Sequence, residues 1–473
     1  MPGSQGNPSE LDRMVQRKGD IVELEIERLL PGGIGAVREG RMTYELRGAL
    51  PGDVVRARIR RIKGSRILAE TQDTISHAFP RVEPRCVHFG KCGGCTWQHI
   101  RYADQLRLKA SFVKRCFEET VLLSGVHVGE LLGCESPYFY RNKMEFSFGE
   151  VSGSNDEGQG NVGLGLHIRG KYDRIFNLTQ CVLQSEGSNG LVEAVRRWAN
   201  EHSLSAYDLR SHDGLLRFLM VREGKFTGES MVNLVVSQPG FCGQDEMARE
   251  MMEKHPQVTS FVLNVNDSKA QIATGKRQIV VAGKRTIREK IGDLMFDVSA
   301  NSFFQTNTRQ AGTLYDTVVE LAELGGNEAA FDLYCGAGAI ALHLSRHAKS
   351  ILGVEVVEEA IRDARRNARL NAVSNCTFVR GEVEDVLADL RSRSTPEVVV
   401  VDPPRAGLHK RVIQALVGLS APRIIYVSCN PESMARDVQA LCIGRYRLEV
   451  LQPVDMFPHT HHVECVARLR RSR

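Results

Sequence analysis

Three short motifs near the C-terminus bring together residue types suited to nucleophilic chemistry. They are Asp-Pro-Pro-Arg at 402–405, Ser-Cys-Asn-Pro at 428–431 and His-Val-Glu at 462–464, and each adjoins a short apolar run typical of a buried strand. A thiol that follows such a strand, Cys429, would lie at the open edge of an α/β sheet, where ligands bind. The sequence therefore predicts a thiol nucleophile with a carboxylate nearby. The alternative is that Cys429 is one more buried small apolar side chain.

A glycine-rich turn upstream predicts a nucleotide-type site. Gly336 follows a predicted strand and precedes a helix expected to begin at Ala339, so the backbone there could approach a ligand. Nineteen residues later, Glu355 ends the next predicted strand, where a carboxylate can accept both hydroxyls of a ribose. The string at 336–341 also satisfies the dinucleotide fingerprint, which keeps an NAD-dependent iron–sulfur oxidoreductase as a second hypothesis. S-adenosylmethionine fits better, because a dinucleotide site requires neither Asp402 nor a nucleophilic thiol.

The elements that would position these residues follow an alternating pattern. Apolar runs at 330–333, 351–354, 398–401 and 424–427 are separated by helical patterns, which predicts a doubly wound, Rossmann-like domain over residues 291–473. Residues 76–290 mix strand patterns with a helix expected from Tyr102 to Phe117, which indicates an α+β domain. Residues 19–75 carry short alternating runs broken by Pro-Gly turns, typical of a small antiparallel β-barrel. We expect residues 1–18 to be a disordered lead-in.

One strand of the expected barrel carries a basic face. Arg56, Arg58 and Arg60 alternate with apolar residues, and six basic residues occur between positions 56 and 66 without an acid. Such a stripe binds single-stranded nucleic acid on small barrels. It could equally be a solvated edge strand that resists aggregation.

The composition limits the compartment and the class of protein. The formal net charge of +5 is small for 473 residues, so the whole chain gives little argument for a polyanionic partner. Twelve cysteines without a signal peptide or a long apolar stretch indicate a reducing cytoplasm, where thiols bind metals or catalyse. We expect no membrane association and a monomer.

The order of the motifs resembles that of the RNA 5-methyluridine methyltransferases, over about Lys18 to Arg468. The matching stretches are FFQTN at 303–307, DLYCG at 332–336, DPPRAG at 402–407, SCNP at 428–431, DMFPHT at 455–460 and HVE at 462–464. The resemblance implies that the barrel is a TRAM domain, of the oligonucleotide-binding type. It further implies a set of roles: S-adenosylmethionine contacts at Gln305, Tyr334, Glu355 and Asp402, the nucleophile at Cys429, and the general base at Glu464. Without the resemblance, Glu464 would equally be an ordinary exposed glutamate on an edge strand.

A separate group of cysteines has the spacing of metal ligands. Cys86, Cys92 and Cys95 are separated by five and two residues, and two glycines between the last pair would let the backbone fold around a metal. The resemblance supplies a fourth ligand, Cys181, and implies a four-iron, four-sulfur cluster. A zinc site using the three cysteines with His99 or Cys181 is the rival, because short Cys-x2-Cys pairs serve both metals.

The resemblance also directs the expectation for the partner. The combination of barrel and cysteine cluster resembles the enzymes that act on 23S ribosomal RNA, with a tRNA uridine as the alternative substrate. A catalytically inactive RNA-binding protein is a further alternative, against which the presence of both Cys429 and Glu464 argues.

Overall fold

The computed structural model describes residues 16–121, 123–151, 162–390 and 395–472. The first fifteen residues of the expected lead-in lie outside this part. The chain divides into two compact units, one formed by Met1–Val82 with His99–Asp104 and the other by Glu83–Gln98 with Gln105–Arg473. Each unit has its own sheets and core.

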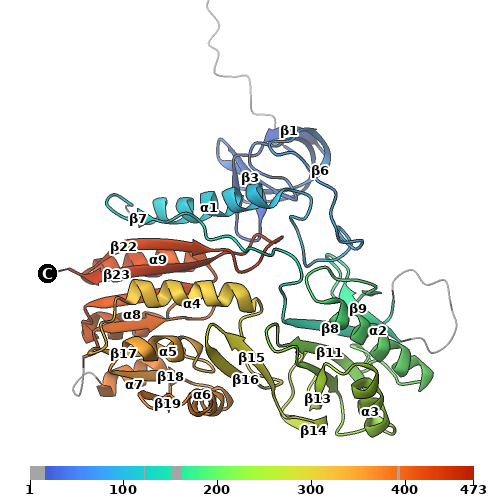
Figure 1. The fold of residues 1–473 in the computed structure, drawn as a ribbon. Helices are drawn as coiled ribbons and strands as arrows, with labels where there is room; N and C mark the ends of the chain where they lie inside the picture. Colours follow the sequence, from blue (N-terminus) through green and yellow to red (C-terminus); the bar gives the residue numbers. More distant parts are fainter. Residues whose placement is uncertain (1–15, 122, 152–161, 391–394, 473) are drawn as a thin grey trace, which may run out of the picture. The chain divides into compact units, whose positions relative to one another are not determined.

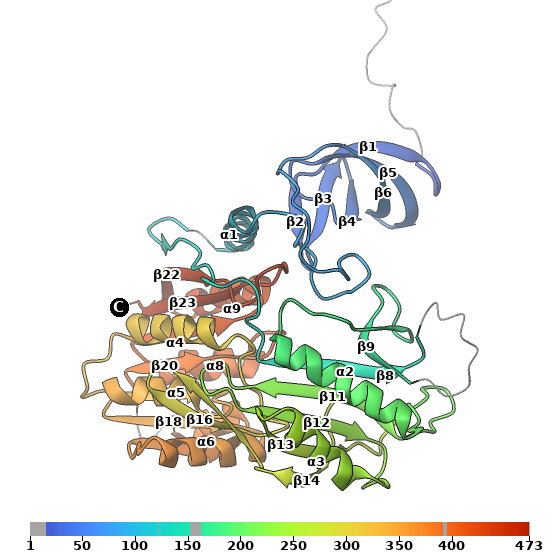
Figure 2. The same cartoon turned by 45° about the vertical axis from the view of Figure 1, so that its right-hand side comes forward.

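The first unit is one curled, six-stranded sheet (Figure 2). Its strands are β1 (Ile21–Glu25), β2 (Arg28–Leu30), β3 (Ile34–Glu39), β4 (Met42–Arg47), β5 (Val54–Lys63) and β6 (Arg66–Ser76), in the order β1-β5-β6-β4-β3-β2. Its core is formed by the inward apolar side chains, with Tyr44, Leu46 and Ile59 fully buried. The expectation of an antiparallel barrel needs correction, because β4 and β6 pair in parallel and the sheet is mixed.

The basic face of β5 exists, but it is neither on an edge strand nor free of acids. Val55, Ala57 and Ile59 are buried. β5 lies between β1 and β6, and its register sets Arg56 opposite Glu23 on one side and Asp73 on the other. The solvated-edge interpretation is therefore wrong in its geometry. Acidic residues of the neighbouring strands balance the charge of this face. The local sequence of β5 does not show that β5 pairs with these strands.

The second unit contains a seven-stranded sheet with two helices on one face. Its strands, in spatial order, are β10 (Ile175–Asn177), β9 (Gly163–His167), β8 (Lys143–Gly149), β11 (Leu216–Glu223), β12 (Ser230–Val236), β13 (Val258–Val265) and β14 (Arg277–Gly283). The helices α2 (Glu186–Glu201) and α3 (Gln244–Lys254) bury Trp198 and Met251 against it. On β8, Met144, Phe146 and Phe148 are buried in this core, and Ser147 is buried as well. The hairpin of β15 (Ile287–Ile291) and β16 (Leu294–Val298) follows β14 (Figure 1).

An eight-stranded sheet forms the rest of this unit. Its order is β19 (Cys376–Arg380), β18 (Ser350–Glu355), β17 (Ala329–Leu333), β20 (Val398–Val401), β21 (Arg423–Ser428), β23 (Glu464–Arg471), β22 (Tyr446–Val454) and β7 (His127–Val128). The first five are parallel, as expected from the alternating pattern. β23 is antiparallel to both β21 and β22, so the sheet is mixed on that side.

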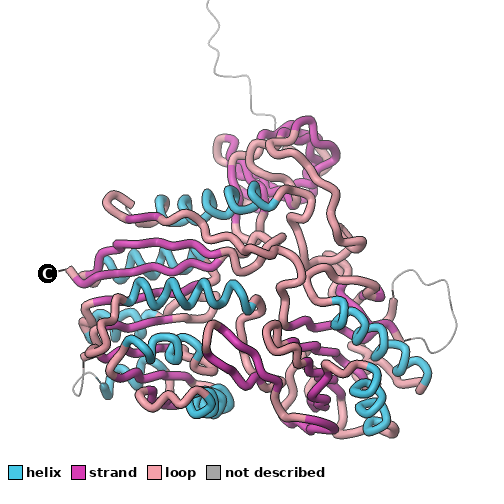
Figure 3. The backbone as a smooth tube through the Cα atoms, viewed as in Figure 1, coloured by secondary structure: helices cyan, strands magenta, loops and turns pink. Residues whose placement is uncertain are grey.

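Two layers of helices bury both faces of this sheet (Figure 3). On one face lie α4 (Thr308–Ala322), α5 (Ala339–Leu344) with the short 3-10 helix Ser345–His347, and α6 (Glu358–Leu370); on the other lie α7 (Val383–Leu390), α8 (Lys410–Leu419), α9 (Pro431–Ile443) and, from Gln105 on, α1 (Tyr102–Glu118). β20 consists of four valines because its side chains alternate between these two cores. Among the described residues, no helix has the length and apolar character needed to cross a bilayer.

Candidate active site and cysteine cavity

The carboxyl edge of the eight-stranded sheet collects the predicted catalytic residues. β17, β20 and β21 are parallel neighbours in register, so Tyr334, Asp402 and Cys429, each directly after its strand, lie along one edge. β23 runs the opposite way and begins at Glu464, and its Cys465 pairs with Ser428. This antiparallel register brings the start of β23 beside the end of β21. The topology thus brings Cys429 and Glu464, 35 positions apart in the sequence, to adjacent strand ends.

The Cys429 thiol is half-buried at the point where β21 turns into α9. The next residue, Asn430, caps α9 by accepting a hydrogen bond from Glu432 N, and Pro431 occupies the first helical turn. Burial, followed by the charge of Glu464, raises the pKa of Cys429 to about 11. The thiol therefore holds its proton at neutral pH in the free protein, despite lying at a helix N-terminus.

The Glu464 side chain is almost completely buried, at 4% exposed. Its desolvation, with a further contribution from Asp402, raises its pKa to about 8, and Arg405 opposes this shift. β23 lies between β21 and β22. The alternative of an exposed glutamate on an edge strand is therefore wrong.

Two further carboxyl groups complete an acidic cluster. Asp402 is half-buried and its surroundings raise its pKa to about 7 by desolvation. Asp332, on β17, is fully buried, and its pKa rises to about 8 through desolvation and the nearby Asp402. One of its oxygens accepts from Ala341 N at 2.9 Å, and the other has no hydrogen-bond partner. At neutral pH the site therefore holds exchangeable protons on buried carboxyl groups.

One exposed cation lies beside this cluster. Arg405 opposes the raised pKa values of both Cys429 and Glu464, and its Nη2 lies 3.2 Å from Nδ1 of His462. Its backbone oxygen accepts from Asn430 Nδ2 at 2.9 Å. This bond ties the loop after β20 to the cap of α9.

The glycine-rich turn after β17 has the expected form. Tyr334 and Gly336 both adopt positive φ angles, 65° and 53°, and a side chain at Gly336 would meet only open space. Glu355 ends β18 and accepts from Gly336 N at 3.2 Å and from Val357 N at 2.9 Å. The backbone amides and the carboxylate thus form one small polar surface at the end of β18.

Gln305 lies in the segment before α4, which packs against β21 and β23. Arg222, fully buried, donates to the backbone oxygens of Ala300 and Ser302 in this segment, and Asn142 Nδ2 donates to Gln305 O at 2.8 Å. These bonds from the seven-stranded sheet fix the segment in front of the helix.

Sequence reasoning gave no role to two residues of this cluster, Asp332 and Tyr315. Tyr315 on α4 is buried, and the charges of Asp402, Asp332 and Glu464 add to desolvation in raising its pKa. It follows the apolar periodicity of α4, so no local signal separates it from a core residue.

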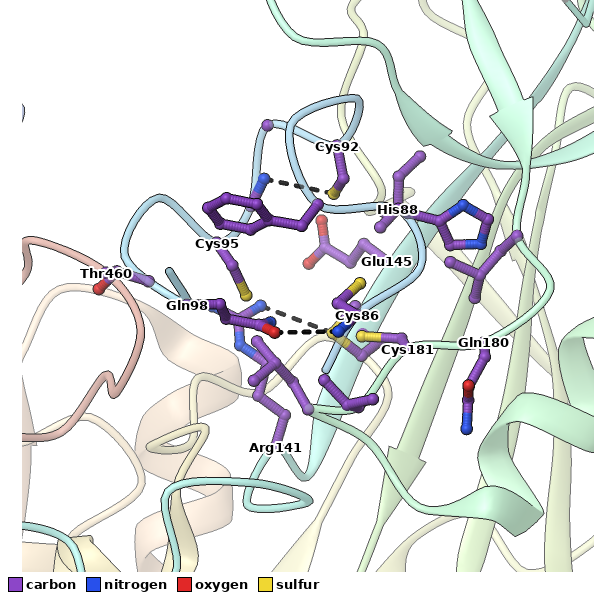
Figure 4. Close-up of a pocket in the computed structure, with 18 of the residues that line it drawn as sticks. Cys86, His88, Cys92, Cys95, Gln98, Arg141, Glu145, Gln180, Cys181 and Thr460 are labelled. Atoms are coloured by element: carbon purple, nitrogen blue, oxygen red, sulfur yellow. Dashed lines mark hydrogen bonds between the residues drawn. The ribbon is translucent and has the colours of Figure 1, made fainter. Parts of the chain in front are cut away.

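The four predicted metal-binding cysteines line one cavity of about 470 Å³ in the second unit (Figure 4). Cys86, Cys92 and Cys95 come from an irregular segment before α1, and Cys181 comes from the loop before α2. Figure 4 shows their side chains around a common space. His99 does not line the cavity.

Burial opposes ionisation of the thiols in this cavity, whereas two neighbouring groups favour it. Burial raises the pKa of Cys95 to about 12 and also raises that of Cys181, with the neighbouring thiols adding to both shifts. Gly94 N donates to the sulfur of Cys92 at 3.3 Å, and Arg141 lines the wall. An amide donor and a cation are the groups that favour a thiolate or a negatively charged cluster.

Within the described part of the chain, no three His, Cys, Asp or Glu side chains are placed to hold a single metal ion. This holds for the four cysteines of the cavity and for the histidines at 459, 461 and 462. Burial lowers the pKa of His459 to about 4, of His461 to about 4 and of His462 to about 3. These rings are neutral at physiological pH.

Comparisons with known proteins agree with this geometry. A family model described as tRNA (uracil-5-)-methyltransferase matches residues 265–472. An uncharacterized RNA methyltransferase of Chlorobaculum tepidum is 37% identical over 98% of this chain and 99% of that protein. Another, from Oceanobacillus iheyensis, is 38% identical over 96% of this chain and 97% of that protein.

A solved structure matches nearly the whole chain. It is the Pyrococcus abyssi tRNA (uracil-54, C5)-methyltransferase in complex with S-adenosyl-L-homocysteine, with a TM-score of 0.75 and 30% identity over 95% of this chain and 100% of that one. The hypothesis of an NAD-dependent oxidoreductase is therefore wrong: the chain belongs to the family of RNA methyltransferases that the tRNA (uracil-5-)-methyltransferase model describes.

Proposed function

We propose that this protein methylates carbon 5 of a uridine in RNA, with S-adenosylmethionine as the methyl donor and a covalent bond between Cys429 and the base. The observation that carries the proposal is the meeting of Cys429 and Glu464 at adjacent strand ends. This reaction needs a nucleophile, because carbon 5 of uracil is a poor nucleophile until another group has added to carbon 6. It also needs a base, because the proton on carbon 5 must be removed after methylation.

Each side chain has one step. The Cys429 thiol, protonated in the free protein, first releases its proton to solvent. Its sulfur, as thiolate, then adds to carbon 6, and the electron pair of the carbon 5–carbon 6 bond makes carbon 5 enolate-like. S-adenosylmethionine would supply the electrophilic methyl group to carbon 5 and leave as S-adenosylhomocysteine. Glu464 then removes the proton from carbon 5, the double bond re-forms, and the thiolate leaves. A base with a pKa near 8 suits a proton transfer at neutral pH.

The cofactor would be held at the same edge of the sheet. We assign Glu355 to the ribose hydroxyls and Tyr334, Gly336, Gln305 and Asp402 to the surrounding wall, in line with the turn after β17 and the anchored segment before α4. Once deprotonated, the carboxyl groups of Asp402 and Asp332 would attract the sulfonium and ammonium groups.

The cysteine cavity would hold a four-iron, four-sulfur cluster through Cys86, Cys92, Cys95 and Cys181. Its volume of about 470 Å³ exceeds what a single ion needs, which favours a cluster over the rival zinc ion. The cluster would fix the irregular segment that carries three of its ligands.

The substrate would be folded RNA with its target base turned out of the stack. A thiolate on one carbon and a methyl donor at the next cannot both reach a base inside a helix. We propose three functional parts: a TRAM-like sheet at residues 19–75, a cysteine-site domain at 76–290 and a methyltransferase domain at 291–473. The 23S ribosomal RNA remains our first candidate; tRNA is the second, because the solved relative named above acts on tRNA.

Two measurements test the proposal. Mass-spectrometric mapping of 5-methyluridine in ribosomal and transfer RNA, from cells with and without the gene, identifies the target, and an unchanged map contradicts the activity. In vitro, Glu464→Gln should methylate its substrate once and accumulate a protein–RNA adduct that survives denaturing electrophoresis. Normal turnover by this variant would remove Glu464 from the mechanism.

A further inference from the structure

The loop that leads into Glu464 is held by a buried ion pair from a distant helix. Residues 455–463 connect β22 to β23 and end directly before Glu464. Lys109 on α1 donates to Asp455 Oδ1 at 2.6 Å and to Phe457 O at 3.0 Å. Neither Lys109 nor Asp455 is exposed, so the pair is fully shielded from solvent. The proposed mechanism assigns no step to either residue.

One helical turn earlier, the same face of α1 makes a second set of contacts. Gln105 is fully buried; its side-chain oxygen accepts from His459 N at 2.8 Å, and its Nε2 donates to Trp97 O at 3.0 Å. Residues four apart on a helix share a face, so Gln105 and Lys109 both bond to the loop from the same side of α1. Gln105 also joins the loop to the segment that carries the cysteines.

The cysteine segment contacts the loop directly as well. The amides of Thr96 and Trp97, the two residues after Cys95, donate to His459 O at 2.9 Å and 3.0 Å. Thr460, the next residue of the loop, lines the cysteine cavity (Figure 4). His459 is thus the point where the cysteine segment, α1 and the loop meet.

The backbone of His459 is in a conformation that these contacts must maintain. Its φ is +67°, in the left-handed region that non-glycine residues rarely occupy, and its side chain is 2% exposed. Such a conformation persists where surrounding bonds over-determine it. Loss of the bonds to His459 would let its backbone relax, five residues before Glu464.

We propose that Lys109 and Gln105 are positioning residues: they hold the loop at 455–463, and through His459 the cysteine segment, in the arrangement that aligns Glu464 with carbon 5 of the bound base. This inference rests on the proposed role of Glu464. Cys429 directly follows β21, outside the loop, so thiol addition and methyl transfer are spared. The step that depends on the two residues is removal of the carbon 5 proton.

The variants must separate positioning from folding. Lys109→Met alone leaves Asp455 buried and unpaired, which can unfold the protein. The double variant Lys109→Met/Asp455→Leu replaces the pair by apolar side chains, a change that folded proteins often tolerate, yet it still removes the bond to Phe457 O. Gln105→Met has a similar shape and removes the bonds to His459 and Trp97. The matched control is Arg217→Met, because Arg217 is a buried cation that holds a loop without catalytic residues, through Asn266 O and Ala270 O.

The decisive measurement is the lifetime of the methylated protein–RNA adduct in a single turnover. The double variant and Gln105→Met should slow adduct decay by about tenfold to a hundredfold, since small misplacements of a catalytic group have effects of this size. The burst of methyl incorporation should stay within about twofold of wild type, and Arg217→Met should release the adduct normally. Equal loss of both steps, or normal decay in both variants, would overturn the inference.

A second readout does not depend on turnover. Amide hydrogen exchange at 456–463 and 95–97 should quicken in both variants and not in Arg217→Met; unchanged exchange would overturn the inference. Glu464→Gln serves as the reference in every assay. If that variant forms no adduct, the proposed base assignment fails, and loop exchange still decides whether Lys109 and Gln105 hold the loop.

Discussion

The carboxyl edge of the eight-stranded sheet and the cysteine cavity assemble their side chains in contrasting ways. At the edge, Asp402, Cys429 and Glu464 each adjoin a strand end, and the hydrogen-bonded ladder of the sheet sets their spacing. In the cavity, three cysteines lie on an irregular segment, and the fourth is held by Asn189 of α2, which bonds both Cys181 N and Cys181 O. A substitution at the edge should therefore change chemistry without changing the fold. A substitution in the cavity should change local stability first.

The two regions also differ in the pKa values of their ionisable side chains. The edge buries carboxyl groups whose pKa values rise to about 7 or 8, so these groups can gain or lose a proton near neutral pH. In the cavity, burial raises the pKa of Cys95 to about 12, so that thiol keeps its proton near neutral pH. Proton exchange near neutral pH is therefore expected at the carboxyl edge and not at Cys95.

The largest expected effect is loss of activity on removing the nucleophile. Cys429→Ala should lower methyl transfer by at least about a thousandfold, because it removes the group proposed to add to carbon 6. Binding of S-adenosylmethionine and the melting temperature should change little. Cys442→Ala is the control and should remain active, because Cys442 is also half-buried and lies near the far end of α9, the helix that follows Cys429. Turnover near the wild-type rate would remove Cys429 from the mechanism.

The next effect in size tests the cavity. Anaerobically purified protein should be brown with iron and acid-labile sulfide, and Cys181→Ser should bleach it. If removal of the cluster costs about 2 kcal/mol of stability, the melting temperature of a unit of this size should fall by about 2–3 °C. Cys242→Ser, at an exposed cysteine, should keep the colour. If the wild-type protein is colourless and contains one equivalent of zinc, the cavity holds zinc and not an iron–sulfur cluster.

A smaller effect should appear in the pH dependence of cofactor binding. The raised pKa values mean that Asp332, Asp402 and Glu464 retain protons below about pH 7 and lose them as the pH rises through about 8. The affinity for the cationic S-adenosylmethionine should therefore rise from pH 6 to pH 8, by up to about tenfold per unit for each proton released. Calorimetry in two buffers of different ionisation enthalpy measures these protons.

The product provides the control for this experiment. S-adenosylhomocysteine lacks the sulfonium charge, so its affinity should depend less on pH. Asp402→Asn should reduce the slope for the methyl donor. An affinity that does not change between pH 6 and pH 8 would contradict the proposed closeness of the sulfonium to the carboxyl cluster.

The smallest effect is expected on the first unit. Reversing the charge of Arg56, Arg58 and Arg60 should weaken RNA binding and reduce its salt dependence, since lost phosphate contacts release fewer counterions. The neighbouring acids, including Glu23 and Asp73, limit the expected change to a few-fold. Reversal of those two acids is the converse control and should strengthen binding. An unchanged salt slope would assign RNA affinity to the second unit.

Much of the edge could be predicted, because each of its elements has a local signal. The predicted run at 398–401 coincides with β20, and the helix expected from Tyr102 to Phe117 is α1, one residue longer. The position of β23 between β21 and β22 could not be predicted, because the residues of an antiparallel strand do not identify the strands with which it pairs. For the same reason, the pairing of β5 with acidic strands was missed.

By itself, the sequence determined which reactive side chains are present and which elements they adjoin: a thiol after one strand, carboxylates beside others, and cysteines at the spacing of metal ligands. Apolar periodicity and turn residues act over a few positions, so they fix where strands and helices begin and end. Only the tertiary structure decided which groups meet and how they ionise. Lys109 and Asp455 are 346 residues apart, and the pKa of Glu464 depends on burial and on Asp402. Desolvation and Coulomb energy depend on distances in space, and no local pattern records those distances.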